Sequence, residues 1–249
     1  MKRLFHHAGS VLRLSVCTLA VLLAAAPAFA RDEPFDPIAA YGTDIVFDVY
    51  RDGKRIGEHR VRFDKTGEAL TAESRFSIRI TILGLPLYKY EYTSVGTWRD
   101  GHLARLNARV DDDGTVSSVN AERSDDKLMV HAGDVQSVAP ASVFPTTHWN
   151  PGVIGTAQVL NTITGHINSV RMKELGTENV VTGGTHRLAR HFAYTGELET
   201  EVWYDMSGRW VKMRFNGKDG TPIEYVCRRC GENSVQNSEG TATTVPGTL

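Results

Sequence analysis

The chain has 249 residues, with 28 Lys and Arg against 29 Asp and Glu, so its formal net charge is −1. Charges of both signs are interleaved, as in Asp52-Gly53-Lys54-Arg55, and no basic cluster forms. Such a chain has no long-range positive field to attract a polyanion, which argues against nucleic acid as a partner.

The first 30 residues have the three parts of a secretory signal peptide. Three basic residues and no acidic one lie in this segment, Leu14–Ala26 is apolar, and Ala28-Phe29-Ala30 offers the small residues that a signal peptidase accepts. The apolar stretch is shorter than the ~20 residues that span a membrane. We therefore predict cleavage after Ala30, a periplasmic or secreted mature protein that is not integral to the membrane, and a mature charge of 25 − 29 = −4.

The remaining chain alternates apolar and polar residues, the pattern of strands with one buried face. It is clearest from Leu70 to Ile82 and again from Tyr88 to Trp98. Asp-Gly pairs, which suit tight hairpin turns, separate several of these segments. After some merging we expect ten or eleven strands, from segments at about 44–50, 55–63, 69–82, 87–98, 103–110, 116–122, 127–131, 134–138, 169–175, 187–195, 200–205, 210–216 and 222–227.

Strands of ~13 residues reach ~40 Å and normally curl. The predicted fold is therefore mainly β, a strongly curved antiparallel meander that forms either a half-barrel or a lipocalin-like barrel. One short helix is predicted at about 151–164, because Asn150-Pro151 resembles a capped helix start and Val153, Ala157 and Leu160 recur at helical spacing before Gly165. This helix would lie across the concave side.

The predicted domain organisation is simple. Residues 31–40 form an N-terminal linker, residues 41–230 form one β-rich domain, and residues 231–249 form a polar tail. The tail has almost no large apolar residue and is predicted to be disordered.

Three sequence blocks carry a resemblance to a known family: Ile45–Gly57, Leu87–Gly101, and Trp203–Asp205 with Asp219–Tyr225. Over about residues 41–228 the chain resembles an uncharacterised family of exported bacterial β-rich proteins, a domain of unknown function. The resemblance implies a periplasmic β domain and supplies no catalytic residue. The expected architecture is more distantly similar to the half-barrels that carry lipoproteins across the periplasm, as a fold analogy only.

Motifs for catalysis, cofactors and metals are missing from the sequence. It has no Gly-x-Ser-x-Gly elbow, zinc-binding His-Glu-x-x-His or phosphate loop. We therefore assign no catalytic residue, no metal ligand and no cofactor. The compact Cys227-Arg228-Arg229-Cys230 motif is interpreted as a disulfide at the end of the last strand, with a redox or metal role as the alternative.

Six residues are predicted to contact a ligand. Tyr88, Tyr90 and Tyr92 form an aromatic stripe, whose ordinary explanation is core packing and whose functional one is a ligand-lining wall. His148 and Trp149 lie in a proline-containing loop, and Leu160 lies on the predicted helix, over an expected deep apolar cavity.

Three functions remain open. The first is a non-catalytic envelope module that binds or carries a hydrophobic or lipid-like ligand. The second is a structural or protein-interaction domain with an envelope protein as its partner. The third is a hydrolase-type enzyme that uses His148, which requires an acid within hydrogen-bond reach of that histidine.

Overall fold

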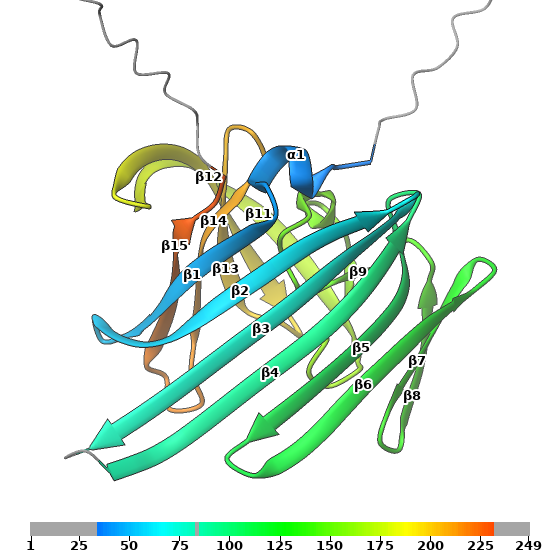
Figure 1. Cartoon of the computed structure of the whole chain (residues 1–249), viewed down its shortest axis with the longest axis horizontal. Helices are drawn as coiled ribbons and strands as arrows, with labels where there is room; N and C mark the ends of the chain where they lie inside the picture. Colours follow the sequence, from blue (N-terminus) through cyan, green and yellow to red (C-terminus); the bar gives the residue numbers. More distant parts are fainter. Residues whose placement is uncertain (1–33, 83–84, 232–249) are drawn as a thin grey trace, which may run out of the picture. The chain divides into compact units, whose positions relative to one another are not determined.

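In a computed structural model, which describes residues 34–82 and 85–231, fifteen strands form a single sheet in the spatial order β8-β7-β6-β5-β4-β3-β2-β1-β15-β14-β13-β12-β11-β10-β9 (Figure 1). Their bounds are β1 Asp44–Arg51, β2 Lys54–Thr66, β3 Ala69–Ile82, β4 Leu85–Arg99, β5 His102–Asp112, β6 Thr115–Ser124, β7 Lys127–Ala132, β8 Val135–Pro140, β9 Phe144–Pro145, β10 Gln158–Leu160, β11 Ile167–Thr182, β12 Thr185–Gly196, β13 Thr200–Asp205, β14 Trp210–Asn216 and β15 Pro222–Arg229.

The sheet is an antiparallel meander, as the alternation predicted, except that β9 and β10 pair in parallel. The first and last strands, β1 and β15, are neighbours at its centre. The edge strands β8 and β9 are not paired with each other, so the sheet is open. This confirms the mainly β, curved-sheet prediction in its half-barrel form.

Tight turns set the register of the long hairpins. Asp52, Asp100 and Asp113, each followed by glycine, have φ near +50°. Asp tolerates this left-handed region better than most residues, and glycine has no Cβ to clash there. The predicted Asp-Gly punctuation therefore closes the β1–β2, β4–β5 and β5–β6 hairpins.

The helix predicted at 151–164 is wrong. Asn150 does cap a helical start, because its Oδ1 accepts a hydrogen bond from the Gly152 N–H at 2.9 Å. The turn is only a 3₁₀ helix, η1 (Pro151–Val153), and Gly155 at φ +85° ends it. Residues 158–160 then extend as β10, so the backbone polar groups there bond to neighbouring strands.

A short helix, α1 (Pro37–Tyr41), capped by Asp36, begins within the predicted N-terminal linker and ends at the first residue of the predicted domain. Its Tyr41 side chain is buried and stacks on Phe63 with ring centroids 5.7 Å apart. The domain boundaries otherwise stay a prediction. Cleavage after Ala30 and the disordered tail fall outside the described residues.

No helix in the described ranges is long and apolar enough to cross a membrane.

Candidate functional site

The concave face of the sheet changes from buried to partly open along β3. Ala72 and Ser74 are buried. The next three inward side chains, Phe76, Ile78 and Ile80, are only half-buried. One end of the concave face is therefore closed and the other open.

The neighbouring strand β4 shows the same change. Its inward Trp98 and Tyr92 are buried, whereas Tyr90 and Tyr88 are half-buried. Since β3 and β4 pair with Ile78 opposite Tyr90 and Ile80 opposite Tyr88, the two strands open at the same end.

A capping segment, residues 141–166 between β8 and β11, fills the closed end. Its Trp149 ring lies 5.1 Å from that of Trp98 and 5.3 Å from that of Phe63, both edge to face. The Tyr92 hydroxyl donates to Thr162 Oγ1 at 2.9 Å. The segment thus packs as part of the core.

Two buried tyrosines hold the backbone of the capping segment. The Tyr204 hydroxyl donates to the carbonyl of His148 at 2.9 Å, and the Tyr41 hydroxyl donates to that of Trp149 at 2.8 Å. His148 has φ +57°, so its carbonyl and the next one can both reach tyrosines from different elements. These bonds satisfy carbonyl groups that burial removes from water.

The open end is apolar and aromatic. The Phe76 ring lies 5.6 Å from Tyr90 and 5.3 Å from Tyr225 of β15, and Tyr225 lies 5.9 Å from the half-buried Phe215 of β14. Burial raises the pKa of Tyr90 to about 12, so this phenol is neutral at physiological pH. The end thus offers aromatic surface with polar tips.

A polar chain of contacts crosses the rim of this end. The Tyr88 hydroxyl donates to Asp112 Oδ1 at 2.7 Å, and Lys218 Nζ donates to Asp112 Oδ2 at 3.0 Å. The hydrogen bond from Tyr88, followed by that from Lys218, lowers the pKa of Asp112. We call Tyr88, Asp112 and Lys218 the rim bridge.

Two buried histidines flank the Trp210 ring deep in the core. Their ring centroids lie 5.6 Å (His59) and 5.7 Å (His148) from that of Trp210. Burial lowers the pKa of His59 to about 3 and that of His148 to about 4, so both are neutral. Both nitrogens of His59 and Nδ1 of His148 lack a hydrogen-bond partner within the described structure.

The predicted ligand residues divide between the two ends. Tyr88 and Tyr90 lie at the open end, whereas Tyr92, His148 and Trp149 are buried under or in the capping segment. Leu160 is also fully buried. A ligand contact by the buried residues stays a prediction. Leu160, however, lies on strand β10 and not on a helix that covers a cavity.

Sequence reasoning missed three residues of this region. His59 alternates in phase with Val61 and Phe63, so its inward position could have been inferred from the strand pattern. Asp112 and Lys218 are far apart in sequence, and no pattern joins them.

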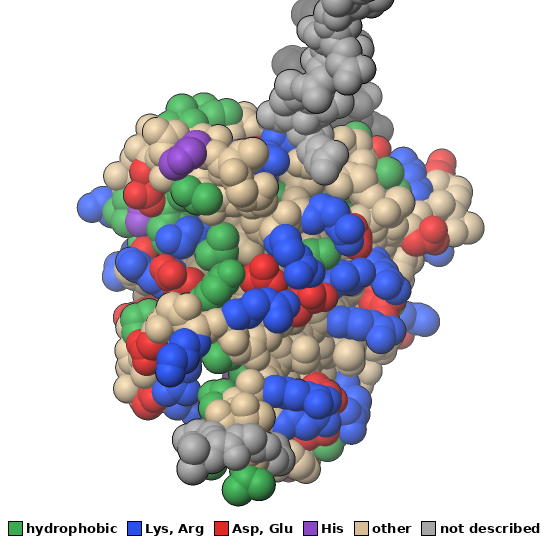
Figure 2. Space-filling view, turned by 60° about the vertical axis from the view of Figure 1, so that its left-hand side comes forward, with side chains coloured by type: hydrophobic (Ala, Val, Ile, Leu, Met, Phe, Trp, Pro, Cys, Tyr) green, Lys and Arg blue, Asp and Glu red, His purple; other side chains and the backbone are tan. Residues whose placement is uncertain are grey.

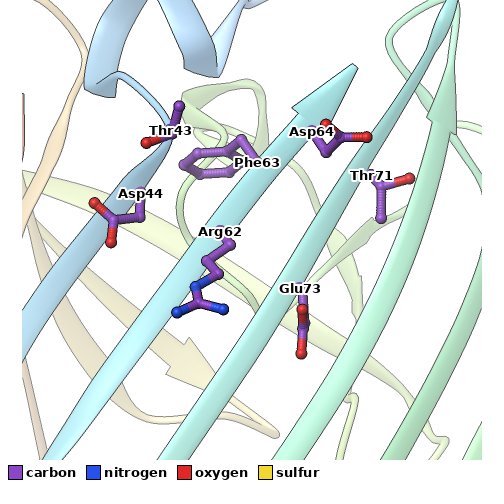
Figure 3. A pocket seen from close by; sticks show the side chains of 7 residues that line it. All are labelled: Thr43, Asp44, Arg62, Phe63, Asp64, Thr71 and Glu73. Atoms are coloured by element: carbon purple, nitrogen blue, oxygen red, sulfur yellow. The ribbon is translucent and has the colours of Figure 1, made fainter. Parts of the chain in front are cut away.

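Two shallow depressions lie on the opposite, outward face of the sheet. One, of about 280 Å³, is lined mainly by polar side chains of β1, β2 and β3 (Figure 3). Another, of about 640 Å³, lies over β5, β6 and β7. The lining residues of the first are Thr43, Asp44, Arg62, Phe63, Asp64, Thr71 and Glu73. Neither depression contains a predicted ligand residue.

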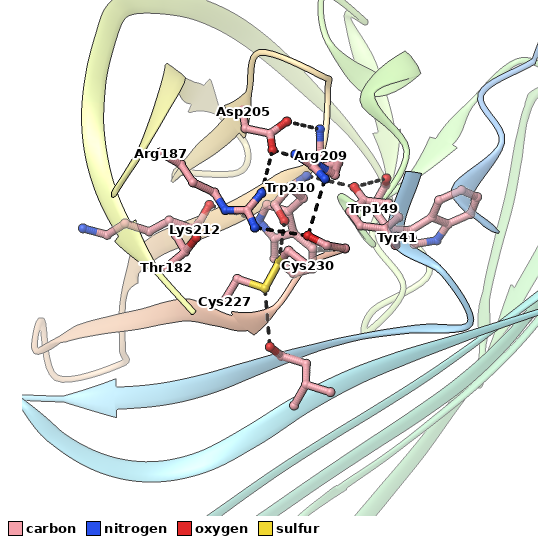
Figure 4. The surroundings of a disulfide bond; sticks show 12 residues. Tyr41, Trp149, Thr182, Arg187, Asp205, Arg209, Trp210, Lys212, Cys227 and Cys230 are labelled. Carbon is pink, nitrogen blue, oxygen red and sulfur yellow. Dashed lines mark hydrogen bonds and ion pairs between the residues drawn. A yellow bond between two sulfur atoms is a disulfide. The ribbon is translucent and has the colours of Figure 1, made fainter. Parts of the chain in front are cut away.

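Cys227 and Cys230 form a disulfide at the end of β15, with Cα atoms 6.1 Å apart, as predicted (Figure 4). Nearby, Asp205 accepts hydrogen bonds from Arg209 Nε at 2.7 Å and from Arg187 at 3.3 Å. Both cysteines are buried. Arg187 and Arg209 also donate to the Gly231 carbonyl, at 3.1 Å and 3.4 Å, which ties the residues just after β15 to the sheet.

The surroundings of the histidines and carboxylates bear on the catalytic alternative. No group of three His, Cys, Asp or Glu there could hold a metal ion. His148 makes no side-chain hydrogen bond to a described carboxylate and contacts the rings of Tyr194 and Trp210. The acid that a hydrolase would need beside His148 is therefore not found among these residues.

Comparison with known proteins gives one family. The model of DUF6134, a domain of unknown function, matches residues 47–228. No curated protein matches the chain. The expected resemblance to a family of unknown function is thereby confirmed.

Proposed function

We propose that this chain, which belongs to the DUF6134 family, is an exported envelope protein that binds a hydrophobic or lipid-like ligand without transforming it. The observation that carries the proposal is the uncovered apolar end of the concave face. Side chains that alternation directs inward, such as Ile78 and Tyr90, keep part of their surface open there.

A half-exposed aromatic surface on the inside of a curved sheet is unusual for a filled core. Burial of apolar surface contributes about 25 cal/mol per Å², so a chain gains by covering such a face. The capping segment covers only the end near Trp98. A ligand that covers the rest would recover the same free energy.

The rim indicates the ligand class. An apolar body can lie on Phe76, Ile78 and Tyr90, while a polar end can meet the rim bridge, which offers a carboxylate, an ammonium group and a phenol. This combination suits an amphiphile such as a fatty acid or a lipid.

Two sequence features support export. The first 30 residues have the organisation of a cleavable signal peptide. The Cys227–Cys230 disulfide is of a kind that persists in an oxidising compartment.

Binding of a fluorescent fatty acid tests the proposal. We expect saturable binding by the purified protein, and Ile78→Asp should weaken it about tenfold or more, because a carboxylate on the apolar wall must be desolvated. Ser77→Asp is the matched control, since Ser77 is the exposed neighbour on the other face of β3.

Circular dichroism and the melting temperature of each variant show whether it folds. Lipids extracted from protein isolated from its native envelope should identify the ligand by mass spectrometry. If the folded wild-type protein binds no probe and carries no lipid, the proposal is wrong.

The alternatives have no observation of their own in their favour. A structural domain would be indicated by cross-linking to one discrete envelope protein together with an empty lipid extract. A hydrolase using His148 would have to expose a side chain that is only 6% accessible.

A further inference from the structure

His59 of β2 is a buried polar side chain without a hydrogen-bond partner. Only 8% of the residue is exposed, and neither of its ring nitrogens is paired within the described part of the chain. Buried polar groups are normally hydrogen-bonded, because an unpaired one has lost its contact with water and gained nothing in return. The unpaired imidazole therefore points to a partner that comes from outside the chain.

The side chains on either side of His59 show the contrast. Glu58 and Arg60 alternate to the outward face of β2 and form an ion pair at 3.4 Å. Figure 2 shows Lys and Arg beside Asp and Glu over much of the face that it views. Polar side chains of β2 on the outside thus pair with each other, whereas the inward histidine does not.

His59 lies where the closed end of the concave face meets the open end. In the β2–β3 pair it stands opposite Phe76, the position at which the inward side chains of β3 become half-buried. Its ring centroid lies 5.9 Å from that of Phe76 and 5.5 Å from that of Tyr225. Both of these rings belong to the open end. The imidazole is thus a polar group at the inner end of the proposed ligand surface.

The cover over the imidazole is aromatic and is incomplete on one side. Three of the rings that lie against it are buried, and the fourth, that of Phe76, is half-buried. These rings are Phe47, Phe76, Trp210 and Tyr225. Because Phe76 borders the open end, a change of its rotamer uncovers the imidazole on that side. Such side-chain changes are common on binding.

The protonation state of His59 defines the kind of partner. Burial lowers the pKa of His59 to about 3, so the ring is neutral and offers one N–H donor and one acceptor nitrogen. A hydroxyl group can pair with either nitrogen, and a carbonyl oxygen can accept from the N–H. An ionised group would have to be desolvated among aromatic rings, which is costly. The matching partner is therefore polar and uncharged.

The distance from the imidazole to the rim bridge sets the length of the ligand. On β3, Phe76 stands opposite His59 and Ile80 stands opposite Tyr88 of the rim bridge. At ~3.3 Å per residue, Phe76 and Ile80 are roughly 13 Å apart. The wall between these two positions is formed by Ile78, which has no polar atom in its side chain.

We propose that the ligand is an apolar chain with a polar group at each end, and that a neutral hydroxyl or carbonyl group at its inner end hydrogen-bonds to His59. The outer end meets the rim bridge. This inference rests on the proposed function, because it assigns the inner end of the same surface. A site built to pair with a hydroxyl group discriminates against a chain that lacks one, so His59 determines specificity. A fatty acid hydroxylated at its far end is a simple member of this ligand class.

Two isomeric probes test the inference. In ω-hydroxydecanoic acid the hydroxyl group lies at the far end of a chain whose length is comparable with the separation of His59 and the rim bridge. In α-hydroxydecanoic acid it lies beside the carboxylate. Displacement of the fluorescent fatty acid at neutral pH gives both dissociation constants. We expect the ω-isomer to bind roughly tenfold more tightly, because only its hydroxyl group reaches the imidazole.

His59→Phe removes both ring nitrogens and keeps an aromatic ring. This variant should lose the preference for the ω-isomer, and it should bind plain decanoic acid at least as tightly as the wild type does. His148→Asn is the matched control. It removes the other buried histidine, which contacts Tyr194 and Trp210, and should keep the preference. Circular dichroism and the melting temperature show whether each variant folds.

Isotopically labelled histidine reports on the contact in the wild-type protein, so the test does not depend on the folding of a variant. The ω-isomer should shift the ring-nitrogen resonances of His59 in the nuclear magnetic resonance spectrum. The α-isomer should leave them nearly unchanged.

The outcomes separate this inference from the proposed function. Equal affinity for the two isomers, with plain decanoic acid still bound, overturns the inference and leaves the proposed function standing. A preference for the ω-isomer that survives in folded His59→Phe also overturns it. If none of the three acids binds to the folded wild-type protein, both the inference and the proposed function are wrong.

Discussion

Lys218 donates a hydrogen bond to Asp112 at 3.0 Å, although four strands of the sheet lie between β5, which ends at Asp112, and β15, which follows Lys218. The contact is possible because the sheet curves until its two walls meet at the open end. The contact between Lys218 and Asp112 closes the rim of the proposed ligand surface.

We expect Lys218→Ala to speed release of a bound fatty acid without unfolding the protein. Exposed ion pairs contribute about 0–1 kcal/mol to stability, and the Lys218 side chain is 91% exposed. Stopped-flow measurement of probe release checks this. Arg105→Gln, which breaks an exposed pair with Glu122 elsewhere, is the control and should not change the rate. Equal rates for all three proteins would contradict a role for the rim bridge.

Tyr41→Phe should destabilise the protein by about 2–4 kcal/mol. The Tyr41 hydroxyl donates to the Trp149 carbonyl and accepts from the Trp210 N–H, both at 2.8 Å. Its removal leaves two buried backbone groups without a hydrogen-bond partner. Urea unfolding measures the loss.

Tyr194→Phe is the matched control. Its buried hydroxyl has no hydrogen-bond partner within the described residues. Removal of that hydroxyl should leave the free energy of unfolding unchanged or raise it. A similar loss in both variants would contradict the interpretation of Tyr41.

Stability should fall as the pH drops below about 6.5. Burial lowers the pKa of His59 to about 3 and that of His148 to about 4, from an ordinary value of 6.5. Between the folded and unfolded pKa values the unfolded chain binds more protons than the folded one. Each histidine therefore lowers the free energy of unfolding by about 1.4 kcal/mol for each pH unit of acidification. Above pH 6.5 this contribution is fully present.

Urea unfolding at pH 7, 6 and 5 measures the slope of the free energy of unfolding against pH. His148→Asn should make it shallower, since asparagine tolerates the positive φ of this position. Tyr194→Phe changes the same cluster and should leave the slope as it is. A wild-type stability that does not vary from pH 7 to 5 would show that the histidines are not buried in neutral form.

Removal of the disulfide should cost about 2 kcal/mol. The loop closed by Cys227 and Cys230 is short, and the chain-entropy model gives a correspondingly small effect. Cys227→Ala with Cys230→Ala and reduced wild-type protein should have the same midpoint of urea unfolding. A reductant that leaves the wild-type midpoint unchanged would mean that the bond is not formed in the isolated protein.

Local sequence patterns were sufficient to predict most strands of the sheet. Alternation placed the long strands β3 and β4 and put Tyr88, Tyr90 and Tyr92 on one face, because side-chain direction in a strand has a period of two. The Asp-Gly pairs located three hairpin turns. The edge strand β9 and its neighbour β10 have only two and three residues, which is too short for any sequence pattern to reveal them.

The capping segment shows where local reasoning failed. Asn150-Pro151 correctly indicated a helical start, but the weight given to residues at helical spacing overlooked Gly152 and Gly155. Glycine is costly within a helix, and β10 could instead pair with β9 and β11. Tertiary pairing therefore decided the conformation.

The sequence by itself determined the strand-rich class, the inward stripe of tyrosines and the Cys227–Cys230 pairing, because each depends on neighbours along the chain. Only the tertiary structure decided that Tyr92 is covered and Tyr90 partly open, and that Lys218 meets Asp112. These facts depend on how far the sheet curves and where the capping segment packs. Both are set by contacts between residues distant in sequence, and the apolar–polar alternation along a strand carries no information about such contacts.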